Sequence, residues 1–328
     1  MKTKDSWYIK IFDDRNVHVF GLGEVSIIEN LSIDARPDLE QKIDWCCKNI
    51  STYTHWGQDE LIQFPSIKFG IETAIKDLDN GGNRILFKSD FTSEGVGIPI
   101  NGLIWMGDRE FMRQQIIDKI EDGYKCIKIK IGALNFSDEL SLLKMLRKEF
   151  SADEMELRVD ANGAFKADEA LEKLKRLSDY KIHSIEQPIA KNQWNSVAEL
   201  CRESPIPIAL DEELIGLNKE EITQMLEHIS PQYIVLKPGL LGGFDICEWI
   251  ISEAGKHNTA WWITSALEAN IGLNAIAQWT FTLNNNMKQG LGTGQLFANN
   301  IDSPLYIEQG RLFYNKENKW DFQDIIHD

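Results

Sequence analysis

The sequence has no run of 18 apolar residues and no Cys-x-x-Cys pair, and it is short of positive charge. Without such a run there is no candidate membrane-spanning helix, and Met1-Lys2-Thr3-Lys4-Asp5 is not followed by the apolar core of a signal peptide. The formal net charge of −16 argues against nucleic acid or an anionic membrane surface as a partner. A small anionic molecule is not excluded, because local lysines or a metal ion can reverse the field within one cleft.

The five cysteines are odd in number and lack metal-ligand spacing, which is typical of a protein from a reducing compartment. We therefore expect a cytoplasmic location. The composition, with 43% hydrophobic and 26% charged residues, is that of an ordinary globular protein. At 328 residues the chain exceeds a typical single domain and is long enough for a barrel with an appended module. The sequence does not indicate an oligomeric state.

The N-terminal part predicts a small α+β domain. Residues 6–12 and 17–28 have the pattern of two strands, and residues 37–50 and 65–78 have apolar side chains at helical spacing. No strand–helix alternation occurs before the polar stretch 87–96. We therefore place one domain at residues 1–95, a second at 96–299, and a C-terminal segment, residues 300–328, that packs back on the first domain.

The central part predicts a modified (β/α)8 barrel, so that the chain is of the α/β class. Polar residues end successive strand-like segments at intervals of 25 to 30 residues, about one strand plus one helix, and these residues are Lys130, Asp160, Glu186, Asp211, Lys237 and Ser265. Helices are expected near 137–150, 167–179, 194–203, 218–229, 243–257 and 270–283, and a short last strand at 290–294. Because parallel strands of a barrel end at one rim, these six side chains should share one mouth.

Three of these strand ends are carboxylates, Asp160, Glu186 and Asp211. Taken singly, they could be a turn residue, a strand terminator and a helix cap. As a set, with no histidine or cysteine beside them, they suit a cation that prefers oxygen ligands, Mg²⁺ or alternatively Mn²⁺. Like charges so close together also need a positive partner between them.

Three lysines flank the carboxylates in strand order. Lys128 and Lys130 lie two residues apart and share one strand face, and Lys237 ends a strand on the other side of the acids. An exposed amphipathic strand would give the same alternation. A lysine acts as a base only when it is neutral, and a neighbouring ammonium group and a dication both favour the neutral form. The arrangement therefore predicts proton transfer beside a bound metal.

The motifs together resemble the enolase superfamily, and within it the o-succinylbenzoate synthase family of menaquinone biosynthesis. The matching segments are Lys128-Ile129-Lys130, Val159-Asp160-Ala161-Asn162, Ile185-Glu186-Gln187-Pro188, Leu210-Asp211-Glu212, Leu236-Lys237-Pro238, Ser265-Ala266-Leu267-Glu268, Ile271-Gly272-Leu273-Asn274-Ala275-Ile276-Ala277 and Gly292-Thr293-Gly294. The resemblance spans roughly residues 7–310. It implies that residues 1–95 form a capping domain.

The resemblance also implies an activity, the Mg²⁺-dependent syn-dehydration of 2-succinyl-6-hydroxy-2,4-cyclohexadiene-1-carboxylate through a metal-stabilised enediolate. Lys130 would remove the proton and return it to the departing hydroxide, Lys237 would stabilise the intermediate, and Lys128 would tune Lys130. Asp160, Glu186 and Asp211 would bind the metal. Ser265 and Asn162 are candidates for substrate binding, although a strand-end hydroxyl such as that of Ser265 can equally bond to backbone.

Members of the superfamily usually begin with a further strand and a mobile loop that covers the substrate. Here the chain enters at once a strand that resembles the second one, so we expect that first strand and lid loop to be absent. Two other functions remain open. An N-succinyl amino acid racemase or dipeptide epimerase would use Lys130 and Lys237 as opposed acid and base, although Ser265-Ala266-Leu267 stands where dipeptide epimerases tend to carry Asp-x-Asp. A non-catalytic metal-binding barrel is the third reading.

Overall fold

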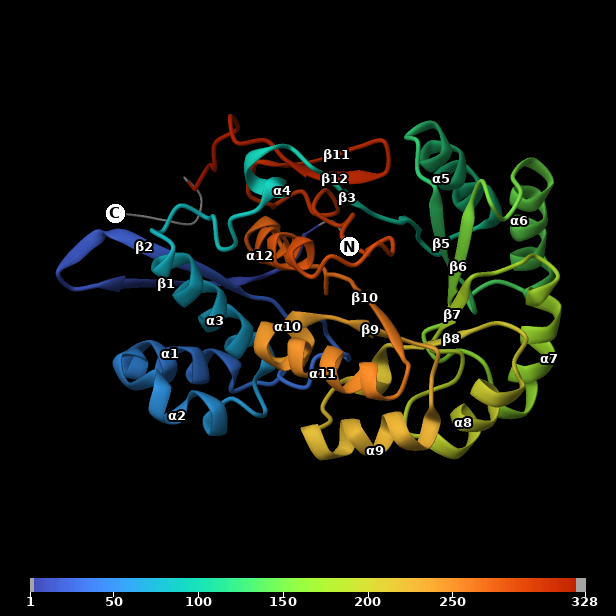
Figure 1. Cartoon of the computed structure of the whole chain (residues 1–328), viewed down its shortest axis with the longest axis horizontal. Coiled ribbons are helices and arrows are strands. Elements are labelled where there is room, and N and C mark those ends of the chain that lie inside the picture. Colours follow the sequence, from blue (N-terminus) through green and yellow to red (C-terminus); the bar gives the residue numbers. More distant parts are fainter. Residues whose placement is uncertain (1–2, 323–328) are drawn as a thin grey trace.

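The computed structural model describes residues 3–322, and its N-terminal elements form a layer beside a barrel (Figure 1). This layer contains the antiparallel strands β1 (Trp7–Asp13) and β2 (Asn16–Val25) and the helices α1 (Leu39–Asn49), η1 (Ile50–Thr52), α2 (Tyr53–Glu60) and α3 (Pro65–Asp79). A Cβ atom at Gly23 would lie 1.8 Å from the carbonyl oxygen of Gly70. Glycine in β2 therefore lets the backbones of β2 and α3 approach each other closely.

The barrel is a parallel sheet whose order is β10-β9-β8-β7-β6-β5-β4, with seven strands among the described residues. The strands are β4 (Gly102–Ile104), β5 (Cys126–Lys130), β6 (Glu156–Asp160), β7 (Ser184–Glu186), β8 (Ile208–Leu210), β9 (Tyr233–Leu236) and β10 (Ala260–Ile263). Each pairs with the next along the chain, as the repeat of strand ends predicted.

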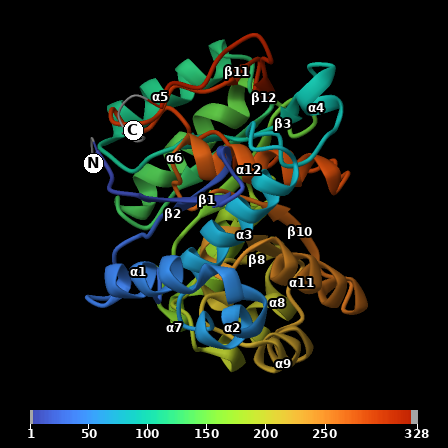
Figure 2. The same ribbon diagram turned by 90° about the vertical axis from the view of Figure 1, so that its left-hand side faces the viewer.

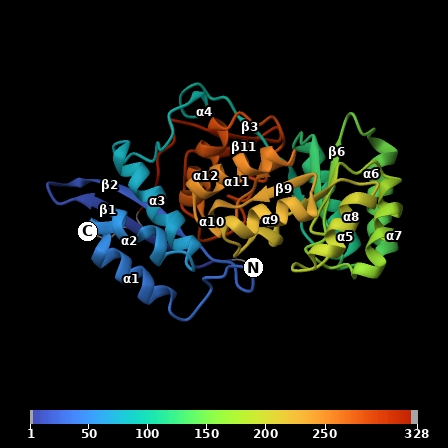
Figure 3. The same ribbon diagram turned by 60° about the horizontal axis from the view of Figure 1, so that its bottom comes forward.

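Helices follow the strands and lie outside them (Figure 3). They are α5 (Arg109–Glu121), α6 (Phe136–Glu149), α7 (Ala167–Ser178), α8 (Trp194–Glu203), η2 (Glu212–Leu214), α9 (Lys219–Ile229), α10 (Pro238–Leu241), α11 (Phe244–Lys256) and α12 (Asn270–Thr282). Asp108 begins α5 by accepting a hydrogen bond from the backbone N–H of Phe111 at 2.9 Å. The helices of the N-terminal layer lie in front of the barrel when viewed from that side (Figure 2).

The ring closes through single parallel bridges rather than through a full eighth strand. Thr264 bridges to Gly290, and Ile100 bridges to Gln289. The expected strand at 290–294 was therefore wrong in extent, since residues 292–294 form a turn. Glycine-rich sequence offers little side-chain packing to a strand, which accounts for the short pairing.

Side chains fill the barrel interior on the N-terminal side of the last strand residues. The guanidinium group of Arg158 lies 4.4 Å from the ring centre of Trp262, and both side chains are buried. Because β6 and β10 are separated by three strands in the sheet order, this contact crosses the barrel. Arg158 also pairs with Glu156 at 2.7 Å and donates to the carbonyl of Lys288 at 3.0 Å, which compensates for its burial.

The remaining elements are a three-stranded sheet and a short helix. The strands β11 (Leu305–Glu308) and β12 (Arg311–Tyr314) form a hairpin that pairs with β3 (Ile98–Pro99), and the short helix α4 (Asp90–Ser93) precedes β3. Ile301, Trp320 and Phe322 pack with Leu22 of β2. The predicted C-terminal segment runs on beyond the described residues, and the division at residues 95 and 299 stays a prediction. Within residues 3–322 there is no helix long and apolar enough to cross a membrane.

Candidate active site

Strand register brings the predicted site residues to one rim. Lys130 of β5 is paired with Asp160 of β6, which is in turn paired with Glu186 of β7. Asp211 directly follows β8 and Lys237 directly follows β9. The five side chains therefore come from consecutive strands at their carboxyl ends, the rim at which barrel enzymes bind their ligands.

The lysines and carboxylates contact each other directly. Oδ2 of Asp160 lies 2.9 Å from Nζ of Lys128 and 3.0 Å from Nζ of Lys130. Lys128 also donates to Glu186. On the other side of the cluster, Lys237 donates to Asp211. Lys128 and Lys130 thus face the carboxylates from one side and Lys237 faces them from the opposite side.

Burial and charge act against each other on these groups. Burial works to lower the pKa of Lys128 and Lys237, but the surrounding carboxylates outweigh it and raise both values. Burial works to raise the pKa of Asp160, yet Lys128 and Lys130 hold it well below its usual range. For Glu186, burial prevails and the pKa is raised, with Asp160 and Asp211 adding to the effect.

The carboxylates fit a divalent cation by their chemistry. Four acids, Asp160, Glu186, Asp211 and Glu212, face three lysines, so the ionised cluster carries one net negative charge. Oε1 of Glu186 is buried without a hydrogen-bond partner, a costly situation that a bound cation would relieve. Among residues 3–322, however, no three acidic, histidine or cysteine side chains already stand in metal-binding geometry, since the lysines engage the acids instead.

Asn162 lies beside Lys130 and connects it to Glu212. Its Oδ1 accepts a hydrogen bond from Nζ of Lys130 at 2.6 Å, and its Nδ2 donates to Oε1 of Glu212 at 2.8 Å. The backbone of Asn162 has a φ of +42°, a left-handed conformation that asparagine tolerates better than most residues. This hydrogen bonding places Asn162 where it orients Lys130.

Ser265 lies at the wall of a cavity of about 190 Å³ that contains the lysines. Its hydroxyl group forms a hydrogen bond of 2.5 Å with the hydroxyl of Thr293. The cavity also has apolar walls, contributed by residues far apart in the chain, namely Ile28, Leu31, Leu103, Trp105, Trp262 and Leu267. Such a cavity, apolar with a charged floor, suits a small organic anion.

Comparison with known proteins gives three related results. Residues 112–316 match the family model described as enolase C-terminal domain-like. The chain is 43% identical to the o-succinylbenzoate synthase of Desulfotalea psychrophila, over 95% of this chain and 92% of that protein. The crystal structure of MenC from Desulfotalea psychrophila superposes with a TM-score of 0.85 at 42% identity, covering 94% of each chain.

The chain belongs to the o-succinylbenzoate synthase family of the enolase superfamily. A more distant relative within the superfamily is the N-succinylamino acid racemase of Thermus thermophilus, 33% identical over 47% of this chain and 39% of that protein. The dipeptide epimerase of Enterococcus faecalis has the same fold, with a TM-score of 0.79 at 17% identity over 96% of this chain and 97% of that chain. The expected fold class and superfamily are confirmed.

Several residues of the site were not found from the sequence. Glu212 had a signal, because it directly follows Asp211 at the predicted rim. Asn101 and Thr293 line the cavity without lying at one of the strand ends used in the prediction. Ile28 and Leu31 come from the N-terminal layer and reach the cavity through a connection with no regular structure, which periodicity cannot place.

Proposed function

We propose that the protein is an o-succinylbenzoate synthase, which removes water from 2-succinyl-6-hydroxy-2,4-cyclohexadiene-1-carboxylate in menaquinone biosynthesis. The observation that carries the proposal is the 43% identity over 95% of the chain to the Desulfotalea psychrophila enzyme of that name. The placement of Lys128 and Lys130 on one side of the acids and Lys237 on the other supports the chemistry.

Lys130 performs the proton transfers. In its neutral form it takes the proton from the ring carbon next to the carboxylate, and the electron pair of that C–H bond moves toward the carboxylate. The bond between the ring and the hydroxyl group then breaks, and Lys130 returns its proton to the departing oxygen as water. The product ring is aromatic. One lysine acting on one face accounts for the removal of both groups from the same side.

Lys237 and Lys128 supply fixed positive charge. Lys237 faces the substrate from the side opposite Lys130 and stabilises the negative charge that develops on the carboxylate. Lys128 shares Oδ2 of Asp160 with Lys130. Its ammonium group adds a second positive charge beside Lys130, on the same side of the acids.

Asp160, Glu186 and Asp211 would hold a divalent cation, Mg²⁺ or Mn²⁺. Such an ion supplies Lewis-acid stabilisation to the substrate carboxylate. Ser265 and Thr293 offer hydroxyl groups at the cavity wall to the succinyl tail of the substrate. A cytoplasmic location agrees with five cysteines that are all free.

The second candidate is N-succinylamino acid racemase activity on the same lysines. It is favoured by the opposed positions of Lys130 and Lys237 and by the relation to the Thermus thermophilus racemase. The experiment supplies the purified protein with Mg²⁺ and either the cyclohexadiene carboxylate or an N-succinyl amino acid. We expect aromatic product from the first and slower or no exchange of the α-proton with the second. Faster turnover of the amino acid would overturn the proposal.

A further inference from the structure

We propose that Lys4 is a positioning residue whose ammonium group ties together the two walls of the substrate cavity. The first wall is residues 26–31, which follow β2 and contribute Ile28 and Leu31. The second wall is residues 264–269, which follow β10 and contribute Thr264, Ser265 and Leu267. The inference rests on the proposed function, because it concerns the binding of that substrate.

The ammonium group of Lys4 has one acceptor for each of its three hydrogens. It donates to the hydroxyl of Ser26 at 2.6 Å, to the carbonyl of Leu267 at 2.8 Å and to the carbonyl of Ala266 at 3.3 Å. Ser26 belongs to the first wall, and the two carbonyls belong to the second. A single ammonium group with all its donors satisfied therefore joins segments that lie more than 200 residues apart in the chain.

The second wall needs such a constraint, because Leu267 has a φ of +61°. A left-handed conformation is unfavourable for leucine, so it persists only where surrounding contacts enforce it. The carbonyl that receives the hydrogen bond from Lys4 belongs to this residue. The side chain of Leu267 lines the cavity, and a change of its backbone would move that surface.

Glu24 holds the far end of the same wall. Its carboxylate accepts hydrogen bonds from the backbone N–H groups of Ala269 at 2.7 Å and Gly272 at 2.8 Å, at the start of α12. Glu24 also accepts from the hydroxyl of Ser6 at 2.9 Å. The start of α12 is thus fixed independently of Lys4. Between Ser265 and Leu267, the N–H groups are bound by other partners, since Ser265 donates to the carbonyl of Gly290 at 3.1 Å and Ala266 donates to Glu268 at 2.6 Å. Lys4 binds the carbonyl side of this segment, at Ala266 and Leu267.

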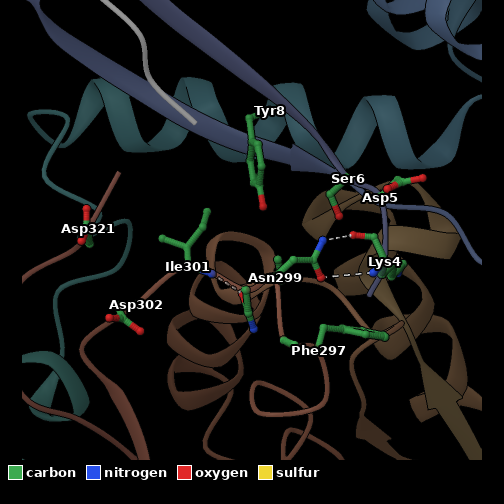
Figure 4. Close-up of a pocket in the computed structure, with 12 residues that line it drawn as sticks. Lys4, Asp5, Ser6, Tyr8, Phe297, Asn299, Ile301, Asp302 and Asp321 are labelled. Atoms are coloured by element: carbon green, nitrogen blue, oxygen red, sulfur yellow. Dashed lines mark hydrogen bonds between the residues drawn. The ribbon is translucent and has the colours of Figure 1, made fainter. Parts of the chain in front are cut away.

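The backbone of Lys4 is anchored separately from its side chain. Its N–H donates to Oδ1 of Asn299 at 3.2 Å, and its carbonyl accepts from Nδ2 of Asn299 at 2.8 Å (Figure 4). A substitution of the side chain leaves both bonds possible, so it removes the tie to the walls without releasing the segment. Methionine keeps the apolar stem and lacks the three donors.

The experiment compares Lys4→Met with Lys10→Met, which changes an exposed lysine on the neighbouring strand β1. Lys4 does not touch the reacting atoms, so its loss should weaken binding of substrate and transition state alike. We expect KM to rise about tenfold while kcat stays within about threefold, since uniform binding is what the change removes. Hydrogen exchange at the amides of residues 264–269 should become faster, and Lys10→Met should match the unchanged protein in both measurements.

Two results would overturn the positioning role. One is a Lys4→Met variant with unchanged KM and unchanged exchange at residues 264–269. The other is a fall in kcat together with faster exchange throughout the chain, which would mean a general loss of stability. If the unchanged protein has no dehydratase activity, the proposed function fails, whereas the exchange comparison still decides whether Lys4 holds the walls.

Discussion

Lys130 donates a hydrogen bond of 2.6 Å from its Nζ to Oδ1 of Asn162, and this contact sets the position of the proposed base. Asn162 is itself held by Glu212, through a bond of 2.8 Å. The amine is thus directed by a pair of side chains outside the carboxylates expected to bind the metal. Asn162, predicted from the sequence as a substrate-binding residue, has in this structure a contact to the base.

We predict that Lys130→Ala removes the dehydratase activity and leaves the fold intact. Loss of a positioned general acid–base group lowers turnover by about 10²–10⁴-fold, because water must replace it in both proton transfers. The rate of aromatic product formation measures the effect, and thermal unfolding checks the fold. Lys166→Ala is the matched control, since that side chain is 78% exposed. Equal rates for the two variants would contradict the role given to Lys130.

We predict that Asn162→Gly lowers kcat and leaves the unfolding temperature nearly unchanged. Glycine accepts the φ of +42° without strain, so the substitution removes the amide group while keeping the backbone. A base that is no longer oriented should lose about tenfold or more in kcat, because small errors of placement are costly. Steady-state kinetics and the unfolding temperature provide the comparison. A variant with a raised KM and normal kcat would instead support substrate binding by Asn162.

We predict that Mg²⁺ stabilises the protein against heat and that a chelator removes the activity. A ligand present at a hundred times its dissociation constant stabilises the folded state by about 2.7 kcal/mol, because it binds the assembled carboxylates and not the unfolded chain. The unfolding temperature in Mg²⁺ and in chelator measures this. Glu186→Gln should show a much smaller difference. A rise of equal size with NaCl of matched ionic strength would indicate general screening instead.

We predict that Glu268 makes the protein less stable as the pH rises from about 4.5 to 7. Burial raises the pKa of this carboxyl group to about 7, so the folded state holds its proton over a range in which the unfolded chain has lost it. Stability from this group is present below pH 4.5 and is lost as the pH passes 7. Glu268→Gln should therefore unfold at a higher temperature than the unchanged protein at pH 8, with the gap closing at pH 4.5. A gap that widens toward acid would refute this.

We predict opposite effects for alanine at two glycines. Gly23→Ala places a Cβ atom 1.8 Å from the carbonyl oxygen of Gly70, and separating β2 from α3 should cost about 1–3 kcal/mol or more. Gly255→Ala, within α11, meets no atom within 4 Å and should gain up to about 1 kcal/mol from helix propensity. Denaturant unfolding compares the two free energies. Similar losses for both would mean that the β2–α3 contact is not as tight as described.

The strand ends were predictable because a barrel repeats one local unit. A strand and its helix take about 25 to 30 residues, so polar residues in phase at Lys130, Asp160, Glu186, Asp211 and Lys237 had to meet once the strands were parallel. The helices were expected between successive strand ends, and α8 (Trp194–Glu203) begins and ends at the expected residues. These features depend on neighbours in the chain.

The walls of the cavity were not predictable, because their conformation depends on contacts between distant segments. One hydrophobic cluster joins residues of the N-terminal layer to residues of the barrel, namely Ile28, Leu31, Ile33, Ile215, Leu240 and Ala266. No local sequence pattern predicts this cluster. Lys4 lies in a polar stretch near the beginning of the sequence and gave no signal at all. The expected last strand at 290–294 included Gly290, but the pairing is limited to Gln289 and Gly290, because the glycines that follow offer no side-chain packing to a strand.

Arg158 stacks on Trp262 inside the barrel, and Trp262 also lines the substrate cavity, so this pair supports the wall of that cavity from within. The aromatic product is a dianion, like the substrate, and binds in the same cavity. We expect the product to be a competitive inhibitor. Product release should limit kcat when the chemical step is fast.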